Sequence, residues 1–154
     1  MKITDGDLIN IALNGDFDVI IHGCNCFCKM RNGIAKQIAN TFPDAEKMDS
    51  LTTIGDRAKL GQVTTSTFFN YNLNTFVIVN AYTQYGINRD GSELSYPAIR
   101  SCFKEVKRLF SGLRIGYPKI GAGLAGGDWN IVSKIIDEEL EGEDHTLVIF
   151  NPEK

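Results

Sequence analysis

The feature that most constrains the fold is a glycine-rich stretch at residues 120–129, IGAGLAGGDW. Gly121, Gly123 and Gly126 form the pattern G-x-G-x-x-G between a strand-like and a helix-like segment. That arrangement is the dinucleotide-binding fingerprint. Only 27 residues follow Gly127, however, which suffices for one helix and one strand. We therefore expect no second half of a dinucleotide-binding fold, and the absence of G-K-[ST] also argues against a P-loop.

Such a loop can still surround a phosphate, because glycine has no Cβ to keep backbone N–H groups at a distance. The alternative is a tight turn without a ligand, but four glycines within seven residues are more than a turn requires. Asp128 directly precedes the next helix and is predicted to cap it, with a catalytic role as the alternative. A capping carboxylate would occupy that helix N-terminus and disfavour phosphate binding there.

Strand-like and helix-like segments alternate along the whole chain. Short β-branched runs predict strands, an apolar period of 3.6 residues predicts helices, and the turn NYNLN between two β-rich runs predicts a hairpin. The pattern indicates a layered α/β domain with a mixed sheet, in which ligands lie beyond the carboxyl ends of the strands. The expected strands are residues 1–4, 17–22, 62–69, 75–82, 113–120 and 146–150, and the expected helices are residues 8–13, 33–42, 44–51, 96–110 and 129–140.

Composition limits the class of protein. The 154 residues are 43% apolar and 23% charged, typical of one folded domain that needs neither disulfides nor a metal. A net charge of −3 argues against a long nucleic-acid duplex as the main partner. Without a long apolar run or a signal peptide, the chain is predicted to be cytoplasmic, with no membrane partner, reduced cysteines and a monomer as the default state.

A second candidate loop lies within residues 22–39, HGCNCFCKMRNGIAKQIA. His22, Cys24, Cys26 and Cys28 alternate there, which suggests a metal site. Residues two apart on a strand lie roughly 6.5–7 Å apart, however, whereas two ligands of one zinc ion must lie within about 4 Å of each other. We therefore predict no metal. The cysteines are interpreted as small buried side chains, with Cys28 placed to contact a ligand.

The same loop offers groups that suit a nucleotide. His22 ends a buried strand, where a structural role and a role in proton transfer are both open. Asn25 can bind a sugar hydroxyl or satisfy the local backbone. Gly33, Ile34 and Ala35 open a helix whose unpaired N–H groups can bind phosphate oxygens. Two such loops facing each other would clamp a diphosphate.

These residues together resemble the macrodomain family over nearly the whole chain. Four pieces carry the resemblance in order: Gly6-Asp7-Leu8, Asn25 followed by GIA at 33–35, GQV at 61–63, and IGAGLAGGDW at 120–129. Residues 22–39 most resemble the yeast-type ADP-ribose 1″-phosphate phosphatase branch. The resemblance implies a single macrodomain over residues 1–154, with a three-layer α/β/α fold around a central mixed β-sheet, and neither cofactor nor metal.

The resemblance also implies an ADP-ribose site. Asp7 would accept a hydrogen bond from the adenine amine, with Leu8 beside it, and Asn25 would bind the distal ribose. Phe150 would pack near the adenine or proximal ribose, with a place in the core as the alternative. His22 matches a histidine just upstream of the ribose-binding asparagine in the phosphatase branch. The two sides of the diphosphate would be held by Gly33, Ile34 and Ala35 and by Gly121, Ala122, Gly123, Leu124, Ala125 and Gly126.

The chain departs from another branch of the family. The relatives that remove ADP-ribose from glutamate use a lysine on a central strand and an aspartate in the second loop. Residues 80–84 contain no lysine, and the loop position holds Ala125, so the covalent lysine route is disfavoured. The sequence LAGGDW nevertheless resembles relatives that remove ADP-ribose from nucleotide bases, and that activity stays open.

The leading hypothesis is therefore a phosphatase that hydrolyses ADP-ribose 1″-phosphate to ADP-ribose and phosphate. His22 would act as acid or base, Asn25 would orient the ribose, Asp128 would steer the water, and loop N–H groups would stabilise charge. The alternatives are an ADP-ribosyl hydrolase acting on modified protein or nucleic acid, and a module that binds ADP-ribose without turnover. The expected partners are small ADP-ribose derivatives, or ADP-ribosylated macromolecules under the first alternative.

Overall fold

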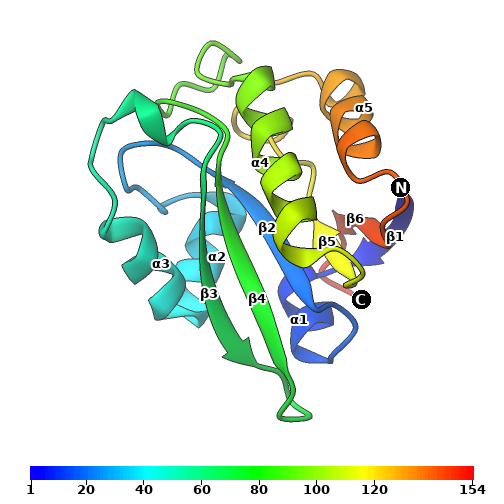
Figure 1. Ribbon diagram of the computed structural model, residues 1–154. Coiled ribbons are helices and arrows are strands. Elements are labelled where there is room, and N and C mark those ends of the chain that lie inside the picture. Colours follow the sequence, from blue (N-terminus) through cyan, green and yellow to red (C-terminus); the bar gives the residue numbers. More distant parts are fainter.

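A computed structural model describes all residues from Met1 to Lys154. It contains one six-stranded sheet in the order β1-β6-β5-β2-β4-β3 (Figure 1). The strands are β1 (Lys2–Gly6), β2 (Val19–Cys24), β3 (Val63–Phe69), β4 (Thr75–Tyr82), β5 (Ile115–Tyr117) and β6 (His145–Phe150). The helices are α1 (Leu8–Leu13), α2 (Gly33–Thr41), α3 (Pro43–Ser50), α4 (Tyr96–Phe110) and α5 (Trp129–Glu139), with a short 3₁₀ helix η1 (Arg57–Lys59).

The sheet is mixed, as predicted. All neighbouring strands run parallel except β3, which forms the expected antiparallel hairpin with β4, paired from Val63↔Ala81 to Phe69↔Thr75. The carboxyl ends of β6, β5, β2 and β4 therefore meet at one edge of the sheet. Strand β5 covers only the middle of the predicted 113–120, and it ends at Tyr117 because the next residue, Pro118, has no N–H to donate to the ladder.

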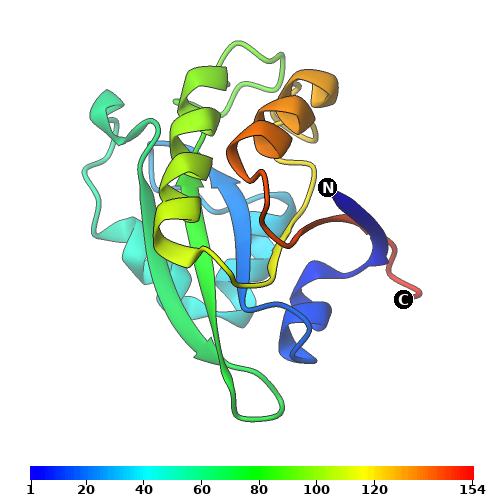
Figure 2. The same ribbon diagram turned by 45° about the vertical axis from the view of Figure 1, so that its right-hand side comes forward.

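Helices cover both faces of the sheet, which confirms the three-layer α/β/α prediction. Helices α4 and α5 lie side by side on one face, and α1, α2 and α3 cover the other (Figures 1 and 2). No helix combines the length and the hydropathy needed to traverse a bilayer.

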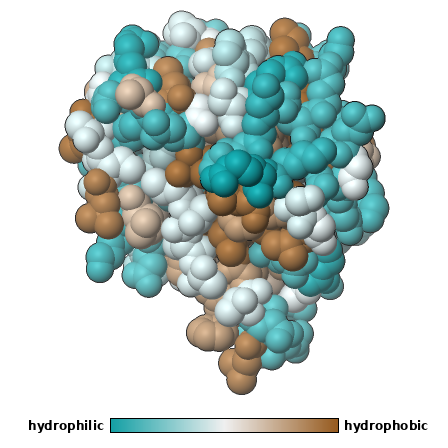
Figure 3. All heavy atoms as spheres, viewed as in Figure 1, coloured by the Kyte–Doolittle hydropathy of each residue, from teal (hydrophilic) through white to brown (hydrophobic).

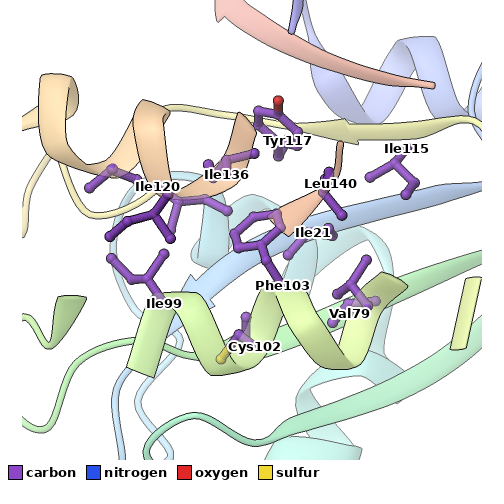
Figure 4. Close-up of a cluster of buried hydrophobic side chains, with 14 of the residues drawn as sticks. Ile21, Val79, Ile99, Cys102, Phe103, Ile115, Tyr117, Ile120, Ile136 and Leu140 are labelled. Carbon is purple, nitrogen blue, oxygen red and sulfur yellow. The ribbon is translucent and has the colours of Figure 1, made fainter. Parts of the chain in front are cut away.

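Each face has its own apolar core. On the α4–α5 side, the rings of Phe103 and Tyr117 meet edge to face with centroids 5.8 Å apart (Figure 4). On the other side, the ring of Phe42 lies 4.8 Å from that of Phe68 and 5.7 Å from that of Phe76. Burying a phenylalanine side chain contributes about 1.5–3 kcal/mol to folding, so these two cores stabilise the packing of the helices on the sheet.

Candidate functional site

A cleft of about 520 Å³ lies at the carboxyl ends of the parallel strands. It is lined by the segment from Gly23 in β2 into α2, by the loops that follow β4 and β5, and by the last residues of β6. This is the edge where parallel α/β sheets usually bind ligands. Both glycine-containing loops identified in the sequence line it, as predicted.

The loop after β5 presents unpaired N–H groups to the cleft. Between Gly121 and Gly127, only the N–H groups of Ala122, Gly126 and Gly127 donate to backbone carbonyls. These three residues do not line the cleft. The four residues that do line it have N–H groups without a partner: Gly121, Gly123, Leu124 and Ala125.

The N-terminus of α2 forms the opposite wall. Asn32 precedes the helix, but its side chain makes no capping hydrogen bond, so the N–H groups of the first helical turn stay available. That turn contains Gly33, Ile34 and Ala35, and all three residues line the cleft. A Cβ added at Gly33 would lie 3.3 Å from Cδ1 of Leu124, so the two walls approach each other closely at this point.

The loop after β4 braces the loop after β5. The N–H of Gly91 donates to the carbonyl of Ala125 over 2.9 Å. A Cβ at Gly126 would collide with the carbonyl oxygen of Arg89, and Gly126 has a φ of +76°. Gly126 therefore allows the two loops to pack closely. Gly126 and Ala122 were both predicted to contact the phosphates, but neither residue lines the cleft, so this prediction is wrong for these two positions.

Asn25 lines the cleft and also shapes its own loop. Its Oδ1 accepts the N–H of Phe27 and its Nδ2 donates to the carbonyl of Lys29, each over 2.9 Å. Both interpretations made for Asn25 are thus compatible with the structure, because the amide retains one further N–H and one further lone pair.

The end of the cleft beside β6 holds Phe150. Its side chain is 63% exposed and lines the cleft, so the alternative of a core position is wrong. Asp7 and Leu8 do not line the cleft: Asp7 caps α1 by accepting the N–H groups of Ile9 and Asn10, and Leu8 is buried. They lie just beyond Gly6, which pairs with Phe150 across β1 and β6.

His22 lies inside the protein and does not line the cleft. Its Nε2 lies 2.6 Å from Oδ1 of Asn80, whose Nδ2 donates to the carbonyl of Ala45 over 2.9 Å. Because that amide group is oriented by Ala45, the histidine Nε2–H is the donor to Asn80. Burial lowers the pKa of His22 to about 4, only partly offset by the hydrogen bond to Asn80. At neutral pH the ring is uncharged, and the geometry gives it no access to a ligand.

Asp128 also lies outside the cleft. Its side chain accepts the N–H of Asn130 over 2.9 Å and caps α5, which confirms the capping interpretation. Its own N–H donates to the hydroxyl of Tyr96. The N-terminus of α5 is therefore occupied by a carboxylate, and that of α2 is the one open to an anion.

The structure also brings Asp49 to the cleft, a residue that the sequence did not indicate. Asp49 is 1% exposed and is the only acidic residue that lines the cleft. Its Oδ1 accepts the hydroxyl of Tyr82 over 2.8 Å, and burial raises the pKa of its carboxyl group. The positive charge of the buried Lys59 lowers the pKa of Asp49 and so partly opposes the effect of burial. The ammonium group of Lys59 donates to the carbonyl of Cys26 over 2.9 Å. No local motif marks Asp49, because only the packing of α3 brings it to the cleft.

The cleft is basic although the chain is acidic. Four cationic side chains line it against the single carboxylate of Asp49: Lys29, Arg31, Arg89 and Lys119. The net charge of the whole chain is −3. A local excess of positive charge concentrates anionic ligands at a concave site. Lys29 and Arg31 stand within the first loop, so their proximity to Gly33 was a usable sequence signal.

Solved structures share this fold. The macrodomain of Mycobacterium tuberculosis DarG is 20% identical, with a TM-score of 0.71, and the match covers 98% of this chain and 97% of that chain. The Trypanosoma brucei macrodomain, solved in complex with ADP-ribose, is 16% identical with a TM-score of 0.63, and the match covers 97% of this chain and 64% of that chain. At these identities the likeness extends to the fold alone.

Sequence comparison gives the family. An uncharacterised 17.5 kDa protein from the tk-vs intergenic region of Enterobacteria phage T4 is 32% identical over 157 residues, covering 99% of this chain and 97% of the phage protein. The family model for the Macro domain matches residues 21–136, which contain both walls of the cleft. The chain therefore belongs to the Macro domain family.

Proposed function

We propose that this protein binds ADP-ribose in the cleft and hydrolyses ADP-ribose 1″-phosphate to ADP-ribose and phosphate. The observation that carries the proposal is the pair of opposed walls with unpaired N–H groups: the uncapped first turn of α2 and the loop from Gly121 to Ala125. Converging N–H groups at a helix N-terminus and a glycine loop are suited to a diphosphate. The T. brucei macrodomain with this fold was solved with ADP-ribose.

The strand order supports one orientation of the ligand. The cleft runs across the ends of β6, β5, β2 and β4. In the proposed complex the adenine lies beside Phe150 at the β6 end. The diphosphate lies between the two walls, and Asn25 binds the distal ribose. The group on C1″ then lies toward β4, where Asp49 and Arg89 line the cleft.

In this proposal the acid–base role falls to Asp49, since His22 and Asp128 lie outside the cleft. Water attacks the terminal phosphorus, and the bond between phosphorus and the C1″ oxygen breaks. Asp49 gives its proton to the departing oxygen and regains one from the attacking water. The raised pKa of Asp49, caused by burial, suits a proton donor.

The substitution Asp49→Asn tests this role. Asparagine can still accept the Tyr82 hydroxyl, so we expect the affinity for ADP-ribose to change less than about threefold. We expect phosphate release to fall about 10²–10⁴-fold, the usual contribution of general acid–base catalysis. The matched comparison is His22→Gln, which should retain turnover. Full phosphate release by Asp49→Asn would remove Asp49 from the mechanism.

The diphosphate position is tested with Gly123→Ala. Gly123 does not have a positive φ, and a Cβ there meets no atom within 4 Å, so alanine fits the folded chain without strain. That Cβ would nevertheless stand in the wall where we place the diphosphate. We expect the free energy of unfolding to change by less than about 0.5 kcal/mol and the affinity for ADP-ribose, measured by calorimetry, to fall at least about tenfold.

The same assays separate the alternatives. Wild type that binds ADP-ribose tightly but releases no phosphate from ADP-ribose 1″-phosphate would be a binding module or a hydrolase of another ADP-ribose linkage. Release of ADP-ribose from a modified protein or oligonucleotide would identify the latter. Absence of ADP-ribose binding by the wild-type protein would refute the site as a whole.

A further inference from the structure

The arginines of the chain differ in what they contact. Arg100, Arg108 and Arg114 each pair with carboxylates, and the guanidinium of Arg57 lies over the Tyr85 ring, 3.7 Å from its centroid. These interactions leave two of the six arginines, Arg31 and Arg89, without a carboxylate or aromatic partner. Both line the cleft. The only arginines with uncommitted guanidinium groups are therefore those that face the candidate site.

The loop that carries Arg89 is built to hold a fixed position. The carboxylate of Glu93 accepts the N–H of Gly86 over 2.7 Å and the side-chain amide of Asn88 over 2.9 Å. Glu93 is thereby engaged within the loop and makes no ion pair with Arg89. The Arg89 carbonyl packs against Gly126, so the loop after β4 is fixed to the loop after β5. Holding the backbone in this way lowers the cost of ordering an arginine on a ligand.

Arg31 approaches the cleft from the opposite wall. It stands just before Asn32, the residue that directly precedes α2, and both residues line the cleft. The unpaired N–H groups of the two walls already supply donors for a diphosphate. The two guanidinium groups, added to those N–H groups, give more hydrogen-bond donors than a diphosphate requires. They suit a further phosphate group, which guanidinium binds through two parallel hydrogen bonds.

We propose that Arg31 and Arg89, which line the cleft from two different segments, bind a terminal phosphate of the ligand and so make the site selective for a phosphomonoester of ADP-ribose over ADP-ribose itself. This inference rests on the proposed function and names the residues that determine its specificity. A phosphomonoester carries about 1.5 to 2 negative charges at neutral pH, which two arginines match. A nucleic-acid strand is the less suitable ligand, because it requires a basic surface along several phosphates and this chain carries a net charge of −3.

The test compares the affinities of two ligands by calorimetry: ADP-ribose and its non-hydrolysable 1″-phosphonate analogue. We expect wild type to bind the phosphonate at least about tenfold more tightly, the usual effect of charge-assisted hydrogen bonds. In Arg31→Gln and Arg89→Gln this preference should shrink, and the double variant should lose it, while the affinity for ADP-ribose stays within about threefold. Arg108→Gln is the matched control, since Arg108 pairs with Glu105 away from the cleft and its loss changes the net charge equally.

Each other result has a distinct meaning. If the arginine variants lose affinity for both ligands to the same extent, Arg31 and Arg89 contact the diphosphate, and the selectivity proposal is overturned. Absence of a preference in wild type that binds ADP-ribose would overturn it while leaving the proposed cleft intact. Binding of neither ligand would overturn both proposals. Arginine variants that lose affinity for an ADP-ribosylated oligonucleotide but not for the phosphonate would identify a nucleic-acid strand as the ligand instead.

Discussion

At the residue scale, His22 shows how a group that suits catalysis can serve the fold instead. Its ring is fully buried, and its partner Asn80 connects it to α3 through the carbonyl of Ala45. Asn80 also donates to the hydroxyl of Thr64 on β3. One histidine and one asparagine thus join β2, β4, β3 and α3 through a buried polar network. Such a network is stabilising only while every member stays uncharged and hydrogen-bonded.

The pKa of His22 makes stability depend on pH. In the unfolded chain a histidine has a pKa near 6.5, whereas burial lowers it to about 4 in the folded protein. Between these values the unfolded state binds more protons, so acid favours unfolding. Wild type should lose about 2–3 kcal/mol more than His22→Gln between pH 7.5 and 4.5, measured by urea unfolding. Equal losses of unfolding free energy in the two proteins would contradict this prediction, because the pKa shifts of Asp49 and His145 are present in both and cannot produce a difference between them.

At the element scale, the turn of the β3–β4 hairpin contains a strained position. Asn70 organises the turn by accepting the N–H groups of Asn72 and Asn74 on its side chain. Leu73 then adopts a φ of +63° with its side chain 79% exposed. A left-handed backbone costs a residue with a Cβ roughly 1–2 kcal/mol, and asparagine tolerates it better than leucine.

Leu73→Asn should therefore stabilise the protein by about 0.5–1 kcal/mol, measured as the free energy of unfolding in urea. The matched control is Leu73→Ala, which also removes the exposed apolar side chain but keeps a residue that is strained at positive φ. We expect no gain from Leu73→Ala. Equal stabilisation by both variants would show that the benefit comes from removing the apolar surface.

At the scale of the whole molecule, the cleft depends on both helical layers. One wall begins α2, which packs on the side of α1 and α3, and the other leads into α5 on the opposite side. In Figure 3 the upper part of the α4–α5 side is largely hydrophilic, and hydrophobic side chains are exposed below the lower end of α4 and at the tip where the β3–β4 hairpin turns. A ligand that bridges both walls would bind only the folded chain.

Such a ligand should raise the thermal midpoint of unfolding. At a free concentration of 100 times Kd, binding adds about 2.7 kcal/mol to stability. For a domain of this size that corresponds to roughly 5–10 °C, measurable by differential scanning calorimetry with ADP-ribose. The Gly123→Ala protein at the same ligand concentration should shift less. An unchanged midpoint at saturating ADP-ribose would argue against binding between the two walls.

Sequence alone located most of the helices and strands and the two loops, because these depend on local patterns. The apolar period over 96–110 coincides with α4, and the β-rich runs around NYNLN form the predicted hairpin. Both glycine-containing loops lie at the strand ends that line the cleft. Local propensity and turn chemistry act over a few residues, so they can be read without knowledge of distant contacts.

Only the tertiary structure decided that His22 stays away from the cleft and that Asp49 and Arg89 reach it. Strand β2 continues past His22 to Cys24, so His22 lies within the strand and not at its end, and its ring is hydrogen-bonded to Asn80 of β4. Asp49 comes to the same cleft from a separate helix, and Arg89 comes from a loop fixed by Gly126. These placements depend on contacts between residues far apart in the chain, whose geometry is set only when the layers pack.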